Sequence, residues 1–182
     1  MSTSHDGVRS GGVERALPDG RVVRLYPAGY DSPAGRALVA AVQQEYVVRY
    51  GGPDDAVVDP AQFEPPAGLF LVAEVDGEAA GCAAWRVHTP GVVEVKRVYV
   101  APHVRRLGLA GLLMDAVEAS AAAAGHRSVV LNTGERQPEA LALYARRGYG
   151  PVPGYGIYAD APDAVFLGKH LTGRTEAQSW AS

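Results

Sequence analysis

The chain has 182 residues, of which 47% are hydrophobic and 20% charged, the length and balance of one soluble globular domain with its own core. A net charge of −3 excludes the strongly basic surface that a nucleic-acid-binding domain needs. No apolar run approaches the roughly 18 residues of a membrane-spanning helix, and none forms the core of a secretion signal. Cys82 is the single cysteine, which excludes an internal disulfide and a cysteine-held zinc, so we expect a cytoplasmic protein with no metal and with neither nucleic acid nor membrane as a partner.

The two ends of the chain differ in pattern from the middle. Residues 1–19 are rich in glycine and serine and lack periodicity, which predicts a disordered tail. A single domain is then expected over residues 20–171, followed by a second tail over 172–182.

Local signals mark the boundaries of the expected elements. Ser32 and Pro33 are typical of a helix start, Asp76-Gly77 of a two-residue hairpin turn, and Gly125 of the residue after a helix. In chain order we expect a strand at 21–27, a helix at 33–50, a loop at 51–68, strands at 69–75, 78–88 and 91–100, a helix at 109–124, a strand at 128–133, a helix at 138–147, and strands at 154–158 and 164–171. This order predicts an α/β (α+β) fold with a mixed, mostly antiparallel sheet of six to seven strands and helices on both faces.

The segment "VRRLGLAG" places charge and small residues at the start of the helix expected at 109–124. The first turn of a helix presents unpaired N–H groups and the positive end of the dipole, so a phosphate can bind there if the backbone is accessible. Gly108 and Ala110 keep the backbone accessible, and Arg105 and Arg106 add cationic donors. The glycine spacing fits neither a dinucleotide fingerprint nor a Walker A loop. The other interpretation is a surface helix start with solvated arginines.

Two motifs carry a resemblance to a known family. "VYVAPHVRRLGLAGLLM" resembles the acetyl-CoA-binding motif of the GNAT superfamily of N-acetyltransferases, with its Arg/Gln-x-x-Gly-x-Gly/Ala core at residues 105–110. "PEALALYARRGY" resembles the second family signature through Ala140, Tyr144, Gly148 and Tyr149. Both motifs occur in the family's order, separated by one helix and one strand. The local sequence resembles a bacterial branch with poorly defined acceptors.

The resemblance implies an acetyl-CoA site in a sheet that is splayed in its middle. The pantetheine arm would pair with the backbone of Val98 and Val100, and the pyrophosphate would lie on the amides of the 105–110 loop. Gln137 stands where many members have asparagine, which puts its contact with the cofactor in doubt. The implied cofactor-binding residues are Val98, Val100, Arg105, Arg106, Leu107, Gly108, Leu109, Ala110, Asn132, Gln137, Ala140 and Tyr144.

The implied reaction is direct attack of a neutral amine on the acetyl thioester. Tyr144 is the candidate general acid for the CoA thiolate, and the alternative is a core tyrosine with its hydroxyl at the rim. Glu94 is the candidate base, directly or through water, and its valine neighbours would raise its pKa. The alternative is a structural pair between Glu94 and Lys96 or another cation. A further alternative is ordered water as the base, as the family often allows. Strand alternation predicts Glu94, Lys96, Val98 and Val100 on one face.

The acceptor is expected to be a small-molecule or peptide amine, bound by the variable segments 46–70 and 151–162. Asp54, Asp55 and Asp59 could attract a cationic amine, and the alternative is solvated loop acids. Family members are often dimers, which makes a homodimer one expectation. A non-catalytic acyl-CoA-binding module is the alternative function, although such a module has no need for Tyr144 and Glu94.

Overall fold

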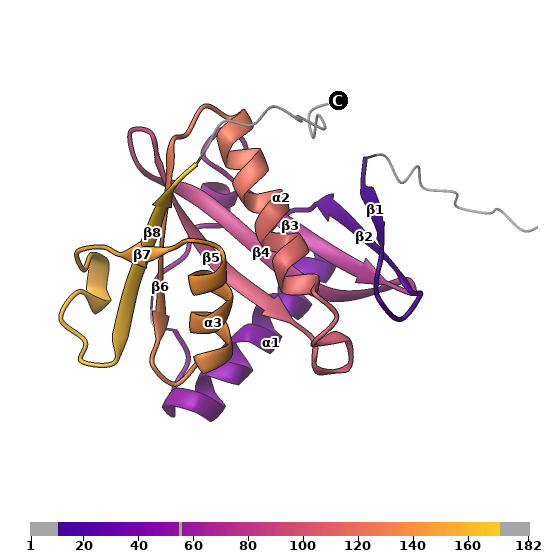
Figure 1. Ribbon diagram of the computed structural model, residues 1–182, viewed down its shortest axis with the longest axis horizontal. Coiled ribbons are helices and arrows are strands. Elements are labelled where there is room, and N and C mark those ends of the chain that lie inside the picture. Colours follow the sequence, from indigo (N-terminus) through magenta and orange to yellow (C-terminus); the bar gives the residue numbers. More distant parts are fainter. Residues whose placement is uncertain (1–10, 55, 172–182) are drawn as a thin grey trace, which may run out of the picture.

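An eight-stranded sheet is the central layer of the computed structural model, which describes residues 11–54 and 56–171 (Figure 1). The spatial order of the strands is β1-β2-β3-β4-β5-β6-β8-β7, and every neighbouring pair is antiparallel except β5 and β6. The strands are β1 (Val13–Ala16), β2 (Val22–Pro27), β3 (Gly68–Val75), β4 (Glu78–Thr89), β5 (Val92–Val100), β6 (Ser128–Gly134), β7 (Gly150–Pro151) and β8 (Ala164–His170).

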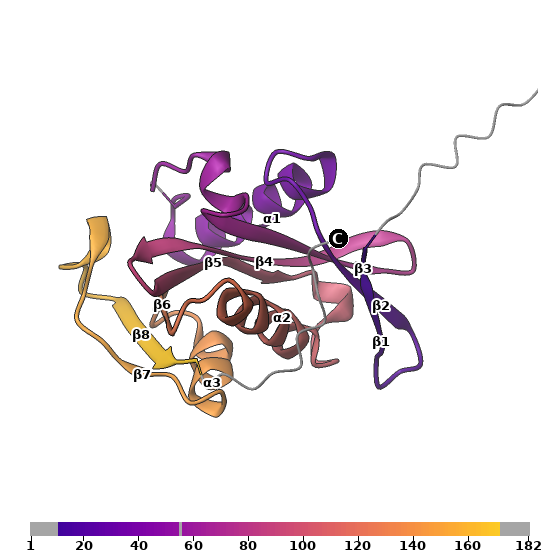
Figure 2. The same cartoon turned by 90° about the horizontal axis from the view of Figure 1, so that it is seen from above.

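Helices cover both faces of this sheet, as Figure 2 shows. The long helices are α1 (Pro33–Tyr50), α2 (Leu109–Ala123) and α3 (Pro138–Arg146), and the short 3-10 helices are η1 (Pro60–Phe63), η2 (Pro102–Val104) and η3 (Gly156–Tyr158). One apolar cluster joins the sheet to α2 and α3, and a second joins its other face to α1 and η1. The expected mixed, mostly antiparallel sheet between helices is confirmed, with eight strands instead of six to seven.

The predicted helix and hairpin boundaries follow from local chemistry. The Ser32 hydroxyl accepts a hydrogen bond from the amide of Gly35 at 3.1 Å and caps α1. Gly51 ends the same helix with a φ of 83°, a conformation that glycine adopts without steric cost. Asp76 and Gly77 both have positive φ, as a tight hairpin between β3 and β4 requires.

Two expectations about the ends of the domain are wrong. Part of the expected N-terminal tail forms β1, whose Val13 pairs with Leu25 of β2, and Leu17 is buried against the core. Four residues are too few to show a period in the sequence, so the partner strand determines this element. The stretch 154–158, expected as a strand, contains η3 instead because its two glycines favour a turn over a ladder. Residues 1–10 and the expected tail 172–182 lie outside the described residues.

The buried Trp85 provides a test of how α2 is held to the sheet. Its indole Nε1–H donates to the Ser120 hydroxyl at 2.8 Å, and that hydroxyl donates to the Val117 carbonyl at 2.9 Å. Both side chains are buried, so Ser120→Ala leaves an indole donor without a partner and is expected to cost about 1–3 kcal/mol of unfolding free energy. Urea denaturation measures the loss. Ser128→Ala, which removes a solvent-exposed hydrogen bond to His170 from a half-buried serine, is the matched control, and a loss no larger than in that control would contradict the assignment.

Candidate active site

The parallel strands β5 and β6 are paired over only part of their length. Their ladder joins Val92–Glu94 to Ser128–Val130 and stops there. Beyond this point β5 remains paired with β4, and β6 remains paired with β8 as far as Gly134. The two strands therefore separate in the middle of the sheet, and the backbone groups of β5 that face β6 are left open to a ligand. This is the splayed sheet that the resemblance implies.

A β-bulge changes the facing of β5 within the open part. Lys96 is opposite Ala84 and Tyr99 is opposite Cys82, so two residues of β5, Arg97 and Val98, stand against one residue of β4. Arg97 has a φ of 59°, which is uncommon for a residue other than glycine.

The extra residue makes the expected common face of Glu94, Lys96, Val98 and Val100 wrong. Val98 and Val100 pack in the cluster that contains α2, together with the flanking valines of Glu94. Lys96 instead lies on the α1 side of the sheet, where it lines a pocket. The side chains of β5 therefore alternate between the two faces as predicted up to the bulge, and each later side chain lies on the face opposite to the predicted one.

The Val100 carbonyl points into the gap between the separated strands. The next amide, Ala101 N–H, donates to the carbonyl of Ala80 in β4 at 2.8 Å. Because the C=O and N–H of one peptide group point in opposite directions, the Val100 carbonyl points away from β4. The Arg105 side chain covers it, since Nε donates to this oxygen at 2.8 Å and Nη2 contacts Glu45 of α1.

The loop before α2 has the backbone of an anion site. Arg106 and Gly108 have φ values of 64° and 81°, and the first bond into the helix joins Leu112 N–H to the Gly108 carbonyl at 3.1 Å. Within the described residues, the amides of 106–111 donate to no protein acceptor. Leu109 is buried and Leu107 is half-buried, so they anchor the loop by side chains while their amides stay available.

Tyr144 lies in the core on α3. Its ring is buried and packs on Tyr149, with 5.5 Å between the ring centroids. Burial, and secondarily the charge of Tyr46, raises the pKa of Tyr144 well above its usual value of 10. The phenol therefore keeps its proton at neutral pH, which a general acid requires. Ala140, one turn earlier on α3, packs against the same core.

Glu94 is held in a buried ion-pair network. Its Oε2 accepts from Arg86 at 2.8 and 2.9 Å, and its Oε1 lies 3.6 Å from the Lys96 ammonium. The Glu94 side chain is 5% exposed and is not among the residues that line the pocket. This arrangement matches the structural-pair interpretation of Glu94. The nearby Tyr155 hydroxyl is buried and has no hydrogen-bond partner among the described residues, and burial followed by the charge of Glu94 raises the pKa of Tyr155.

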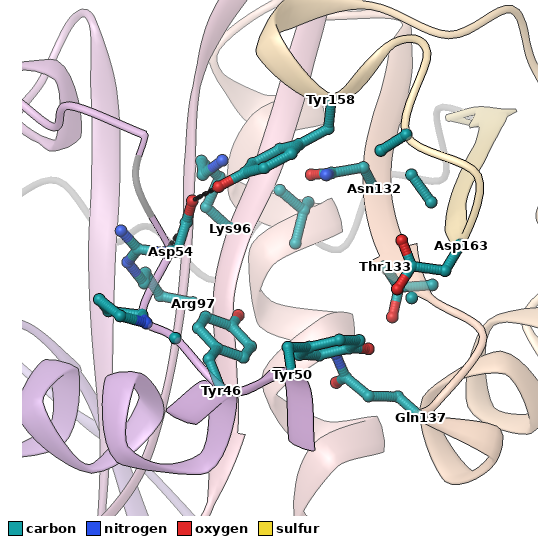
Figure 3. A pocket seen from close by; sticks show the side chains of 16 residues that line it. Tyr46, Tyr50, Asp54, Lys96, Arg97, Asn132, Thr133, Gln137, Tyr158 and Asp163 are labelled. Atoms are coloured by element: carbon teal, nitrogen blue, oxygen red, sulfur yellow. Dashed lines mark hydrogen bonds and ion pairs between the residues drawn. The ribbon is translucent and has the colours of Figure 1, made fainter. Parts of the chain in front are cut away.

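A pocket of about 380 Å³ opens where β5 and β6 separate (Figure 3). The end of α1, the following loop, β5, β6, the start of α3 and the segment before β8 form its walls. The lining residues are Tyr46, Tyr50, Gly52, Pro53, Asp54, Val95, Lys96, Arg97, Asn132, Thr133, Gly134, Gln137, Tyr158, Ala161, Asp163 and Ala164. Asn132 and Gln137 thus lie in the expected region, and Gln137 already donates to the Tyr50 hydroxyl at 3.0 Å.

Arg97, to which the sequence pattern assigns no role in the site, is the centre of a buried network on one wall of the pocket. Its Nη1 donates to Asp54 at 2.6 Å and its Nε to the Tyr30 hydroxyl at 3.2 Å. Asp54 also accepts from Ala56 N–H and from the Tyr158 hydroxyl. Its burial raises the pKa, but these hydrogen bonds outweigh burial and lower the pKa of Asp54 below its usual value.

Neither of the two loop aspartates that the structure describes has a carboxylate without a partner. Asp54 is already neutralised by Arg97. Asp59 caps η1 by accepting from Ala61 N–H at 3.0 Å. Asp55 lies outside the described residues.

Residues 11–54 and 56–171 contain neither a candidate metal site nor a candidate membrane span. No group of three or more histidine, cysteine, aspartate or glutamate side chains is placed to hold a metal ion. In the same part of the chain, no helix is both long and apolar enough to cross a membrane.

Comparison with known proteins identifies the family. The model of the acetyltransferase (GNAT) family matches residues 35–149, which include the splayed strands, the loop before α2 and α3. The chain belongs to the GNAT acetyltransferase family. The resemblance seen in the two motifs is thereby confirmed, and the protein is an acyltransferase rather than only a binding module.

Individual relatives of this acetyltransferase support the same assignment. An IAA acetyltransferase of Azospirillum brasilense is 31% identical over 147 residues, which cover 78% of this chain and 95% of the relative. A crystal structure from Klebsiella pneumoniae that carries the name acyl-CoA N-acyltransferase is 31% identical, with a TM-score of 0.71 over 82% of this chain and 98% of the other. A GNAT acetyltransferase from Elizabethkingia anophelis with acetyl-CoA bound shares the fold, with a TM-score of 0.61 at 18% identity over 82% and 98% of the two chains.

Proposed function

We propose that the protein transfers the acetyl group of acetyl-CoA to a primary amine by direct attack within a ternary complex. The observation that carries the proposal is the gap between β5 and β6. The pocket lies where the two strands begin to separate. Further along, β5 leads into the loop before α2, whose amides at 106–111 donate to no acceptor within the described residues. A thioester cofactor along this gap would bring its acetyl group to the pocket.

The cofactor is held mainly by backbone groups in this proposal. Its pyrophosphate binds the free amides of residues 106–110, with Arg106 as a cationic neighbour. The pantetheine arm pairs with Val98 and Val100 in the manner of an added strand. Arg105 then has to leave the Val100 carbonyl, which frees its guanidinium for a phosphate. Asn132, Gln137 and Ala140 form the opposite side of the gap.

The chemistry requires a proton for the departing thiolate and a place for the amine's proton. Tyr144 supplies the first in this proposal, because its phenol is protonated at neutral pH. Tyr144 does not itself line the pocket, but Tyr46, which does, is close enough to affect its pKa. Free N–H groups of β5 stabilise the tetrahedral oxyanion. The amine's proton leaves through ordered water, since Arg86 and Lys96 occupy the Glu94 carboxylate.

The role of Glu94 is tested with Glu94→Gln. We expect kcat to stay within about tenfold of wild type, because general bases contribute roughly 10²–10⁴-fold, while the melting temperature falls since Arg86 loses its charged partner. The measurement is the pH profile of kcat/KM, whose acidic limb should keep its midpoint. Disappearance of that limb in the variant would instead make Glu94 the base, directly or through water.

The cellular setting is proposed from the sequence. We expect a cytoplasmic bacterial enzyme that acts on a small-molecule or peptide amine, needs no metal and binds neither nucleic acid nor membrane. A homodimer is the expected assembly. Sedimentation velocity decides between monomer and dimer.

Cofactor binding is tested with a matched pair of glycine variants. Gly108 and Gly125 flank α2, have φ values of 81° and 91°, and have open space around an added Cβ. Alanine at either site brings a similar backbone strain of roughly 1–2 kcal/mol, but only Gly108 lies in the proposed cradle. We expect Gly108→Ala to bind CoA about tenfold more weakly and Gly125→Ala to bind it as wild type does.

Thermal denaturation with acetyl-CoA, CoA and NAD measures both effects. A ligand at 100 times its Kd stabilises the fold by about 2.7 kcal/mol, and a thiol-release assay with an amine panel follows. Stabilisation by acetyl-CoA and CoA but not by NAD supports the proposal. No shift with either CoA compound, or equal weakening in both variants, would refute the cradle.

A further inference from the structure

The pocket contains one cation that its protein partners do not satisfy. The Lys96 side chain is 8% exposed and lines the pocket. Its described partner is Glu94, at 3.6 Å, which is too long for a good hydrogen bond. Glu94 is bound more closely by Arg86, so two cations share one carboxylate on this wall. A buried ammonium with unused donors favours an anionic ligand.

The other charged groups on the same wall do not neutralise the Lys96 ammonium. Arg97 and Asp54 neutralise each other at 2.6 Å, and Arg97 also donates to Tyr30. Tyr158 donates to Asp54. Lys96 is therefore the cationic group of the pocket that remains available to a ligand.

The opposite wall carries a carboxylate, that of Asp163, which also lacks a close partner within the described residues. Asp163 precedes β8, on the far side of β6 from Lys96, and Figure 3 shows the two side chains across the pocket from each other. Within the described residues its carboxylate has no hydrogen bond or ion pair, although its backbone carbonyl accepts from Glu135 N–H. A pocket with a free cation on one wall and a free anion on the other complements a ligand with the reverse pair of charges.

We propose that the acceptor is an amino acid, with its carboxylate on Lys96 and its amino group on the Asp163 side. This inference rests on the proposed N-acetyltransferase function and narrows its substrate class. The volume of about 380 Å³ suits a molecule of this size beside the acetyl group, and the rings of Tyr46, Tyr50 and Tyr158 line the space left for its side chain. A polyamine is disfavoured, because it would bring a second cation towards Lys96.

The test compares L-phenylalanine with L-phenylalaninamide, which differ in the charged carboxylate. The amine of the amide is less basic and loses its proton more readily, so intrinsic reactivity favours the amide. We expect wild type nevertheless to show a kcat/KM about 10- to 100-fold higher for the amino acid. Lys96→Met should abolish this preference and Lys96→Arg should restore most of it. Asp163→Asn should lower kcat/KM for both compounds.

Two features make the outcome unambiguous. The ratio of acid to amide is taken within each variant, so a general loss of folded protein cancels. Lys169→Met, which removes the chain's other lysine from its ion pair with Glu118, is the matched control and should keep the wild-type ratio. Equal use of both compounds by wild type, or a preference that survives in Lys96→Met, overturns the inference.

Failure of the enzymatic proposal is separable from failure of this one. Thiol release with amines that lack a carboxylate, and not with amino acids, leaves acetyl transfer intact and overturns the amino-acid inference. If no amine releases thiol, the acetyl-transfer proposal fails. The amino-acid inference is then tested by binding, from the thermal shifts that L-phenylalanine and L-phenylalaninamide cause in the CoA-bound protein. A larger shift with the amide than with the acid overturns it.

Discussion

Tyr144→Phe is expected to lower kcat by about 10²–10⁴-fold while CoA binds with wild-type affinity. The substitution removes one hydroxyl from a buried ring and leaves the packing on Tyr149 in place. The CoA thiolate would then depart without a proton donor. Burial raises the pKa of Tyr144, so the phenol stays protonated through neutral and mildly alkaline pH, and its ionisation should not limit wild-type kcat there.

The neighbouring tyrosine gives a matched control for this variant. Tyr149 lies in the same cluster, but its hydroxyl donates to Glu118 at 2.9 Å. Tyr149→Phe should therefore reduce stability by about 1 kcal/mol and leave kcat near wild type. Steady-state thiol release measures kcat, and a thermal shift with CoA measures binding. If Tyr144→Phe turns over as fast as Tyr149→Phe, Tyr144 is a core residue and the acid assignment is wrong.

Arg97→Met is expected to reduce the free energy of unfolding by about 3–5 kcal/mol, because it leaves the Asp54 carboxylate without its buried partner. For a chain of this length the loss corresponds to a fall of roughly 6–20 °C in melting temperature. Calorimetry or urea denaturation measures it. A second variant, Arg97→Met with Asp54→Asn, should recover part of the loss, since it leaves no buried charge. A single variant as stable as wild type would show that the pair contributes nothing.

The Asp54–Arg97 pair also predicts how the stability of the protein changes at acidic pH. The folded-state pKa of Asp54 is below its usual value, so its stabilisation is present above the unfolded-state pKa of about 4. It is lost as the pH falls from there through the folded-state pKa. The stability difference between wild type and Asp54→Asn should thus be constant from about pH 5 to 7 and shrink below about pH 4. A difference that grows on acidification would contradict this sign.

The parts of the fold that could be predicted are those that local chemistry determines. Ser32 and Pro33 mark the start of α1, and Gly51 marks its end, because each stands directly at a helix boundary. Asp76-Gly77 can be read as a turn because few other residue pairs tolerate two positive φ angles. The start of α2 was predictable for the same reason, since Gly108, directly before it, has a φ of 81°.

The parts that could not be predicted depend on partners distant in sequence. The strand β1 exists because β2 and Leu17 hold it against the sheet. The bulge at Arg97 appears only when β5 is aligned with β4, although adjacent cations within a valine-rich strand were a signal of irregular facing. Asp163 shares the pocket with Lys96 only because β8 is folded next to β6, and no spacing along the chain reveals this.

The bulge also limits how this enzyme can diversify in evolution. The inserted residue lets β5 present Lys96 and Arg97 to the pocket and then Val98 and Val100 to the α2 core. The insertion of one further residue after Val98 would turn Tyr99 towards the α2 core and Val100 towards α1, and would shift the start of α2 relative to the gap. The length of β5 is therefore constrained by two sites at once. Changes of acceptor have to come from substitutions at fixed length, or from insertions in the segments before β3 and β8, which touch the pocket but not the register of the sheet.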